Sequence, residues 1–173
     1  MKLYLPLLIC ILLWKTDFFA QYPPNQPQQD CIHATPVCSA IIYESNSYQG
    51  DGNILGEIDS TTSCLGRAEQ NGGWYLIHTL SAGDICFTIT PDSAQQDIDW
   101  GVFNLTHATC EDIKTDPSLE VSCNFITNGG PCGGITGADG ALGGVCGFQH
   151  APCIPAQKGE TYVLYVSSYN LFD

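Results

Sequence analysis

Short segments in which apolar and polar residues alternate are the feature that most constrains the fold of this chain. Side chains of a β-strand point to opposite faces with a period of two, so such segments predict strands with one buried face. The clearest are residues 74–80, 85–90, 100–105 and 161–167. Weaker candidates are residues 40–44, 55–58 and 119–125. No helical periodicity of useful length separates them, so the sequence predicts an all-β, antiparallel two-layer β-sandwich of jelly-roll type.

The turn residues and the end of the chain refine this expectation. Residues 81–84 (SAGD) separate two alternating segments and predict a hairpin between 74–80 and 85–90. Residues 161–167 are almost wholly apolar, which predicts a central strand. Only six residues follow that strand, so we expect an unpaired edge or a missing last strand, and therefore a truncation at Asp173.

Glycine dominates residues 128–147, which also contain Cys132 and Cys146. Glycine maximises backbone entropy and contributes no side chain to a core. We therefore expect this segment to be a long surface loop closed by cysteines and not a packed element.

The N-terminus has the pattern of an export signal. Met1 and Lys2 precede twelve apolar residues, a run too short to span a bilayer but typical of a signal peptide, and Ala20 suits cleavage. The sequence therefore predicts a signal peptide over 1–20, a flexible Pro- and Gln-rich lead-in over 21–30, and a single domain over 31–173.

After cleavage the chain is strongly acidic, with three basic residues against seventeen acidic ones and a net charge of −14. Such a surface repels phosphate backbones and anionic lipid, which argues against nucleic-acid partners and against membrane insertion after signal cleavage. It attracts divalent cations.

Nine cysteines remain after cleavage, and behind a signal peptide this density indicates disulfides. A zinc site normally uses Cys-x-x-Cys pairs, which the chain lacks. The odd number leaves one thiol that is free, pairs with another chain, or has lost its partner to truncation. The disulfide candidates are Cys31, Cys38, Cys64, Cys110, Cys123, Cys132 and Cys146.

Several short motifs occur in a fixed order between residues 30 and 167: DC at 30–31, PVCS at 36–39, SCLG at 63–66, WY at 74–75, FTITP at 87–91, DIDWGVFNLT at 97–106, CEDI at 110–113, VSCN at 121–124 and AQKGETYVL at 156–164. In these motifs the chain resembles the N-terminal β-sandwich module of Bacteroidetes surface proteins that carry a gliding-motility-associated C-terminal domain and a type IX (type B) sorting signal. The resemblance implies a secreted or outer-membrane cell-surface protein that depends on export machinery and continues into further domains. Cys86, Cys132, Cys146 and Cys153 are outside the family pattern, so the disulfide pairing stays open.

The titratable residues give little sign of catalysis. His33, His78, His107 and His150 have neither metal-ligand nor triad spacing, and the chain has no H-E-x-x-H or G-x-S-x-G motif. His78 is expected to be a hydrogen-bonded residue of a strand face. We therefore expect no enzymatic activity.

Calcium is the one cofactor that the sequence suggests. Asp97 and Asp99 are two apart in a predicted strand, so their carboxylates share a face and are candidate calcium ligands, with backbone carbonyls completing the site. The alternative is two solvated acids at a strand start. Residues 51–62 match an EF-hand loop in part but lack its fifth-position oxygen and its final acid.

Together these features predict a non-catalytic, structural or adhesive module whose partners are other cell-surface components or extracellular glycans. The alternative is a carbohydrate- or calcium-dependent binding module accessory to a secreted enzyme. Aromatic side chains would then stack on sugars. Trp74, Tyr75, Trp100 and Tyr165 are available, although alternation places at least half of them in the core.

Overall fold

The computed structural model describes residues 26–45, 48–66, 69–126 and 132–169, so the predicted signal peptide lies outside the described residues. Strands dominate this part of the chain. They are β1 (Thr35–Pro36), β2 (Gly72–His78), β3 (Gly83–Ile85), β4 (Phe87–Ile89), β5 (Ile98–Asn104), β6 (Glu120–Asn124), β7 (Thr136–Ala138), β8 (His150–Ala151), β9 (Ile154–Ala156) and β10 (Thr161–Ser168). The helical elements are α1 (Cys110–Ile113) and the 3-10 turns η1 (Pro27–Gln29), η2 (Cys31–His33), η3 (Pro117–Leu119) and η4 (Gly147–Gln149). The predicted all-β fold is confirmed.

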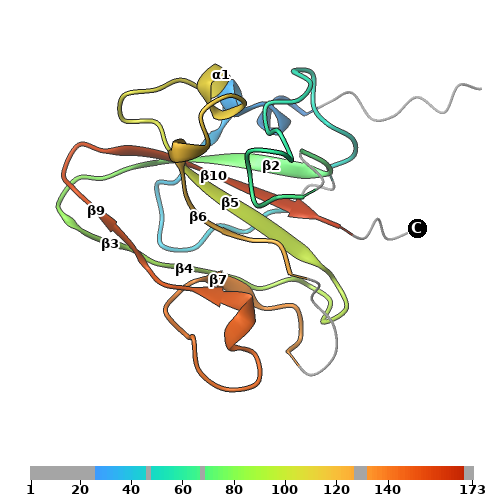
Figure 1. The fold of residues 1–173 in the computed structure, drawn as a ribbon. Helices are drawn as coiled ribbons and strands as arrows, with labels where there is room; N and C mark the ends of the chain where they lie inside the picture. Colours follow the sequence, from blue (N-terminus) through green and yellow to red (C-terminus); the bar gives the residue numbers. More distant parts are fainter. Residues whose placement is uncertain (1–25, 46–47, 67–68, 127–131, 170–173) are drawn as a thin grey trace, which may run out of the picture.

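A five-stranded sheet in the order β1-β2-β10-β5-β6 forms the middle of the molecule (Figure 1). β10 is rich in β-branched and aromatic residues, which favour strands, and it pairs antiparallel with β2 on one side and with β5 on the other. Its central position is therefore confirmed. The expectation that this strand lacks a partner is wrong, because β10 inserts between two earlier strands instead of adding at an edge. Truncation at Asp173 stays a prediction.

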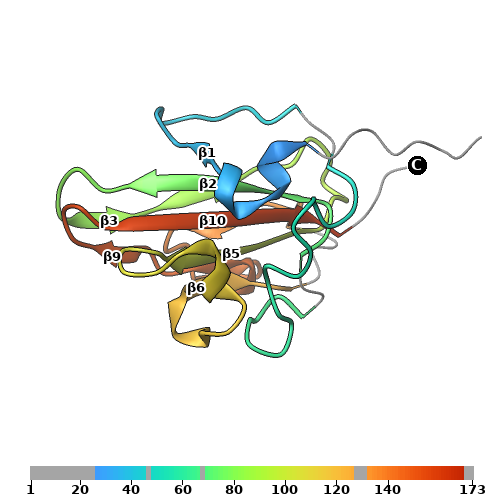
Figure 2. The ribbon, with the colours of Figure 1, turned by 90° about the horizontal axis from the view of Figure 1, so that it is seen from above.

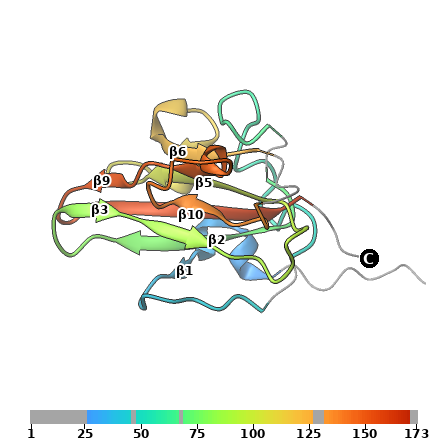
Figure 3. The same ribbon diagram turned by 90° about the horizontal axis from the view of Figure 1, so that it is seen from below.

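Two smaller sheets, β3-β9 and β4-β7-β8, lie over one face of the large sheet (Figures 1 and 3). Trp100 and Val102 of β5 are fully buried on this face. They belong to one apolar cluster with Ala138 of β7 and with Ile154 and Ala156 of β9. This cluster joins the layers.

The opposite face is covered by η1, η2, α1 and the segment 48–66, which we call the cap segment (Figure 2). Trp74 and Tyr165 project from the sheet into this second cluster, which also contains Ile58 and Leu65 of the cap segment and Ile113 of α1. Neighbouring residues such as Trp74 and Tyr75 thus enter opposite clusters, as the period-two pattern predicts.

The other strand predictions had mixed outcomes. Residues 119–125 contain β6, as predicted, but 40–44 and 55–58 form no strand. The hairpin between 74–80 and 85–90 is also wrong, because β2 pairs with β1 and β10, whereas β3 pairs with β9. A turn signal shows where the chain reverses, but it does not show which sheet the next strand joins. Cys86 divides the second segment into β3 and β4.

The glycine-rich segment differs from expectation. Its residues 128–131 lie outside the described residues, but Thr136–Ala138 form β7, which is fully buried and pairs with both β4 and β8. Gly137 has a φ of +153°, and a Cβ there would collide with the backbone of Phe87 and Thr88. The prediction of an unpacked loop is therefore wrong for this stretch, since close approach of β4 requires a residue without a side chain.

Two smaller differences concern the edges of the fold. The lead-in boundary at residue 31 is too late, because Gln29 and Asp30 are 3% and 2% exposed. The pairings β1–β2 and β7–β8 are parallel, so the sheets are antiparallel in their main pairings only.

Candidate functional site

The predicted calcium ligands are buried and not solvated. Asp97 directly precedes β5 and Asp99 lies within it, and each is 5% exposed. Asp99 lines a cavity of about 10 Å³, close to the minimum for one water molecule. Among the described residues, neither belongs to a group of three His, Cys, Asp or Glu side chains near enough to share an ion. Calcium at this pair stays a prediction.

One such group does exist, formed by Cys64, Glu120 and Cys123. Two of its three members are joined by a disulfide, so their sulfur atoms are not free thiolates. Glu120 accepts hydrogen bonds from the Ser63 hydroxyl at 2.6 Å and from the Cys64 N–H at 2.9 Å. The group therefore anchors the cap segment to β6 and is not a metal centre.

Three buried carboxylates lie where the cap segment meets the N-terminal segment and the start of β2, and we call Asp30, Glu57 and Glu69 the carboxylate cluster. The Asp30 carboxylate accepts the backbone N–H groups of Asn53 at 2.6 Å and Ile54 at 2.9 Å. This arrangement turns the amides of the partial EF-hand match toward an anion, so that stretch is not built around a cation.

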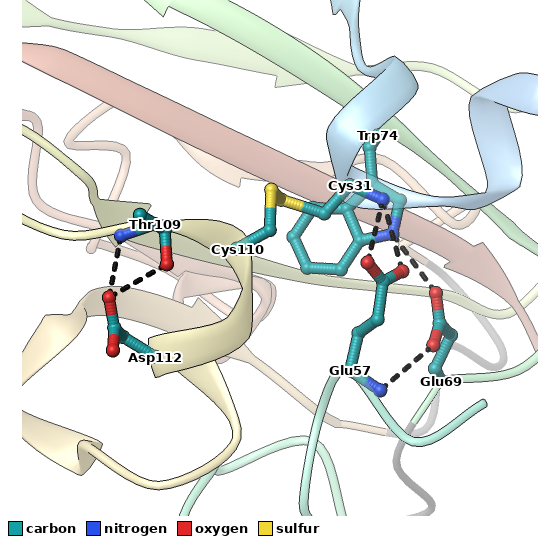
Figure 4. Close-up of a disulfide and its surroundings, with 7 residues drawn as sticks. All are labelled: Cys31, Glu57, Glu69, Trp74, Thr109, Cys110 and Asp112. Carbon is teal, nitrogen blue, oxygen red and sulfur yellow. Dashed lines mark hydrogen bonds between the residues drawn. A yellow bond between two sulfur atoms is a disulfide. The ribbon is translucent and has the colours of Figure 1, made fainter. Parts of the chain in front are cut away.

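Glu57 and Glu69 complete the cluster beside the Cys31–Cys110 disulfide (Figure 4). They are 6% and 5% exposed. Both oxygens of Glu57 accept the Cys31 N–H, at 3.1 and 3.0 Å. Glu69 accepts the Trp74 indole N–H at 3.0 Å and the Glu57 N–H at 3.3 Å. The two side chains thus connect the N-terminal segment, the cap segment and β2.

Burial is the main cause of unusual titration at this pair. It raises the pKa of Glu69 to about 9, and the nearby charge of Glu57 acts in the same direction against the Trp74 hydrogen bond. Burial also raises the pKa of Glu57, opposed by the Cys31 N–H. Glu69 therefore holds a proton at neutral pH. Sequence reasoning missed this cluster, because its members are far apart and follow no local pattern.

A polar groove of about 520 Å³ lies where β5 ends and β6 begins, and we call it the end groove. It is lined by Asn104, Thr106, His107, Ala108, Asp112, Asp116, Ser118, Leu119, Val121 and Glu160. Hydrogen bonds from Thr109 lower the pKa of Asp112, and the Gln157 N–H lowers that of Glu160. The groove has the size of a small-ligand site and presents fixed negative charge.

The predicted sugar-stacking aromatics are not at the surface. Trp74, Trp100 and Tyr165 are fully buried, and Tyr75 is 9% exposed. The exposed large apolar side chains instead include two groups on connecting segments. One is Ile41, Ile42 and Tyr43, which follow β1 along the sheet edge (Figure 2). The other is Leu142 and Val145 of the glycine-rich segment together with Phe148, which follows it in η4.

Among the described residues, no histidine belongs to a group of three possible metal ligands. The His78 ring lies 3.2 Å from the Thr161 hydroxyl, in keeping with its expected role on a strand face. His150 contacts the Asp139 carboxylate at 2.9 Å, a pair that the sequence analysis missed. Asp139 also accepts the Thr88 hydroxyl and the Ala141 N–H, so this pair fixes the turn after β7.

The structure resolves the cysteine pairing. The disulfides are Cys31–Cys110, Cys64–Cys123, Cys86–Cys153 and Cys132–Cys146. Six of the seven candidates are therefore paired. The prediction of a disulfide at Cys38 is wrong, since Cys38 is exposed and has no disulfide partner in the described chain. The pair Cys86–Cys153 was not among the disulfide candidates.

Among the described residues, Cys38 should be the single reactive thiol of the chain once the predicted signal peptide, which contains Cys10, has been removed. Maleimide treatment without reductant should add one label per molecule, because an exposed thiol reacts and a disulfide does not. Mass spectrometry of the intact protein counts the labels, and Cys38→Ser is expected to take none. Two or more labels on the folded chain would contradict the pairing.

Comparisons with known proteins give no family for this chain. No protein-family model, curated protein or solved structure matches it. The family resemblance therefore stays a proposal. In the described part of the chain, no helix combines the length and apolar character needed to cross a bilayer. The four disulfides indicate an oxidising environment outside the cytoplasm.

Proposed function

We propose that this chain is a non-catalytic module of an exported bacterial protein, with a structural or adhesive role at the cell surface or after release. The observation that supports the proposal most strongly is that the disulfides join distant segments of the chain. Three of the four disulfides join segments 59 to 79 residues apart, and each has an end in a connection between strands. Such crosslinks restrict the unfolded chain and suit a module that must persist outside the cell.

The buried polar groups support the same role. All three members of the carboxylate cluster accept backbone N–H groups, and the Trp100 indole N–H donates to the Thr136 hydroxyl at 2.8 Å. These groups therefore position loops and strands. The two exposed apolar groups provide a surface for contact with other cell-surface components.

We further propose the finer points of the assignment. The three sheets make a β-sandwich of jelly-roll type. The chain is the N-terminal module of a Bacteroidetes surface protein exported by the type IX route, with further domains after Asp173. Sequencing of the downstream reading frame tests this directly, and a sorting domain there is the expected result. An immediate stop codon would contradict it.

Adhesion can be tested with beads that carry the mature chain. We expect the beads to attach to intact cells of the source organism, and the double variant Ile41→Ser, Tyr43→Ser to attach several-fold less, since these side chains are 66% and 90% exposed. Leu80→Ser is the matched control, because Leu80 is 81% exposed and belongs to a different segment, the connection between β2 and β3. Equal attachment of coated and bare beads would contradict an adhesive role.

A carbohydrate- or calcium-dependent binding module is the second candidate, and the end groove favours it. Its carboxylates, hydroxyls and the Asn104 amide are the groups that bind sugar hydroxyls or hard cations. A glycan array with and without EDTA distinguishes the candidates. Sugar retained in calcium alone supports the binding module, whereas no retention in either buffer supports the structural or adhesive role.

A further inference from the structure

The Glu57–Glu69 pair has properties that the proposed function does not use. The two carboxylates are each about nineteen-twentieths buried, and Glu69 accepts a hydrogen bond from the backbone N–H of Glu57 itself. No ion pair within the described residues neutralises either of them. Two adjacent charges in such a site repel each other strongly, so the closed arrangement requires that the pair keep a proton.

The contacts of the pair connect segments that would otherwise separate. Glu57 holds the start of η2 through the Cys31 N–H, and Glu69 holds β2 through the Trp74 indole. Ile58, next to Glu57, is 1% exposed and packs in the same apolar cluster as Trp74. Movement of Glu57 therefore moves the cap segment relative to the sheet.

The surroundings of the pair are mostly acidic or neutral. Asp30 raises the pKa of Glu57 and His33 lowers it, both from the N-terminal segment. Tyr165 of β10 is uncharged at neutral pH, because burial raises its pKa and the charge of Glu69 acts in the same direction. Asp51 of the cap segment adds negative charge near Tyr165. From the α1 side, the Lys114 amine lies near Gly56 and helps to lower the pKa of Asp59 in the cap segment.

We propose that Glu57 and Glu69 form a pH-sensitive latch, closed while the pair holds one proton and opened when that proton is lost as the pH rises. Opening exposes the carboxylates to water and releases the cap segment from Trp74. The disulfide Cys31–Cys110 holds η2 to α1, and Cys64–Cys123 holds the end of the cap segment to β6. The motion is therefore local and reversible. The device regulates access to this face of the large sheet and is independent of the proposed function.

The direction of the effect follows from linkage. The pKa of Glu69 is raised in the closed state, from 4.5 to about 9. Its contribution to the closed state is therefore complete below pH 4.5 and is lost as the pH rises toward 9. Within that window one released proton increases the opening constant roughly tenfold per pH unit.

Hydrogen–deuterium exchange of the intact mature chain tests the latch. We expect exchange of cap-segment peptides, divided by the rate in Glu69→Gln at the same pH, to rise roughly tenfold per unit from pH 6 to 8. Glutamine keeps an acceptor for Trp74 and cannot lose a proton. Glu111→Gln, an exposed glutamate on α1, is the matched control and should behave like wild type. β10 peptides should show no such rise.

The outcomes are separable even if one variant does not fold. The wild-type rate can instead be divided by that of the same chain in urea, and Glu57→Gln gives a second variant in which the charge repulsion is absent. A corrected wild-type rate that is constant between pH 6 and 8 would overturn the proposal. So would an equal pH dependence in wild type and Glu69→Gln.

Discussion

Replacement of both Cys31 and Cys110 by alanine is expected to lower the free energy of unfolding by about 4–5 kcal/mol, the largest effect of any disulfide in this chain. The bond joins residues 79 apart and therefore restricts the unfolded chain more than the other three. Cys31 is also 2% exposed within the core cluster that contains Trp74, so its loss leaves a cavity. Urea unfolding at constant pH measures the difference.

The matched control is the pair Cys132→Ala, Cys146→Ala. Its disulfide closes a separation of only 14 residues, so about 3 kcal/mol or less is expected. An equal loss in both double variants would show that loop length does not determine the effect. No loss in the Cys31, Cys110 variant would contradict the stabilising role proposed for this disulfide.

Gly137→Ala is expected to destabilise the protein by about 3 kcal/mol or more. The added Cβ would collide with the Phe87 carbonyl and the Thr88 Cα, and both atoms belong to the backbone of β4. The neighbouring strand must therefore move, and the φ of +153° is also strained for alanine. Thermal and urea unfolding measure the loss.

Gly143→Ala is the control within the same glycine-rich segment. A Cβ at Gly143 meets no atom within 4 Å, and its backbone has no positive φ, so little change is expected. If both alanine variants are equally stable, β7 is not packed against β4. The segment would then be the surface loop that its composition suggests.

The strands of the large sheet were largely predictable because their signal is local. β2, β5, β6 and β10 carry side chains that alternate between two buried faces, and that alternation is visible in the sequence. Their pairing is set by contacts between distant residues, so the expected hairpin from β2 to β3 failed. Only tertiary structure shows that β10 lies between β2 and β5.

β7 could not be found from the sequence for a physical reason. Thr136, Gly137 and Ala138 are small because β4 and β8 approach closely on both sides, and small residues give no hydrophobic pattern. Composition alone assigns a glycine-rich stretch to a loop. The same residue type therefore signals freedom in one context and close packing in another.

The candidate sites show a similar division. Asp97 and Asp99 could be proposed from the sequence because their spacing is local, whereas Glu57 and Glu69 lie twelve residues apart and each lies outside the helices and strands. Their interaction depends on how the cap segment folds over Trp74. The pairing of Cys86 with Cys153 was equally inaccessible, since spacing does not specify connectivity.

Peptide mapping of the exported chain by mass spectrometry, with thiols blocked and no reductant added, tests the central claim that disulfides hold the connections of this all-β module in place. The expected crosslinked peptides join Cys31 to Cys110, Cys64 to Cys123, Cys86 to Cys153 and Cys132 to Cys146, with Cys38 recovered as the blocked thiol. Recovery of all nine mature cysteines as blocked thiols, or of Cys38 within an intramolecular crosslink, would contradict it.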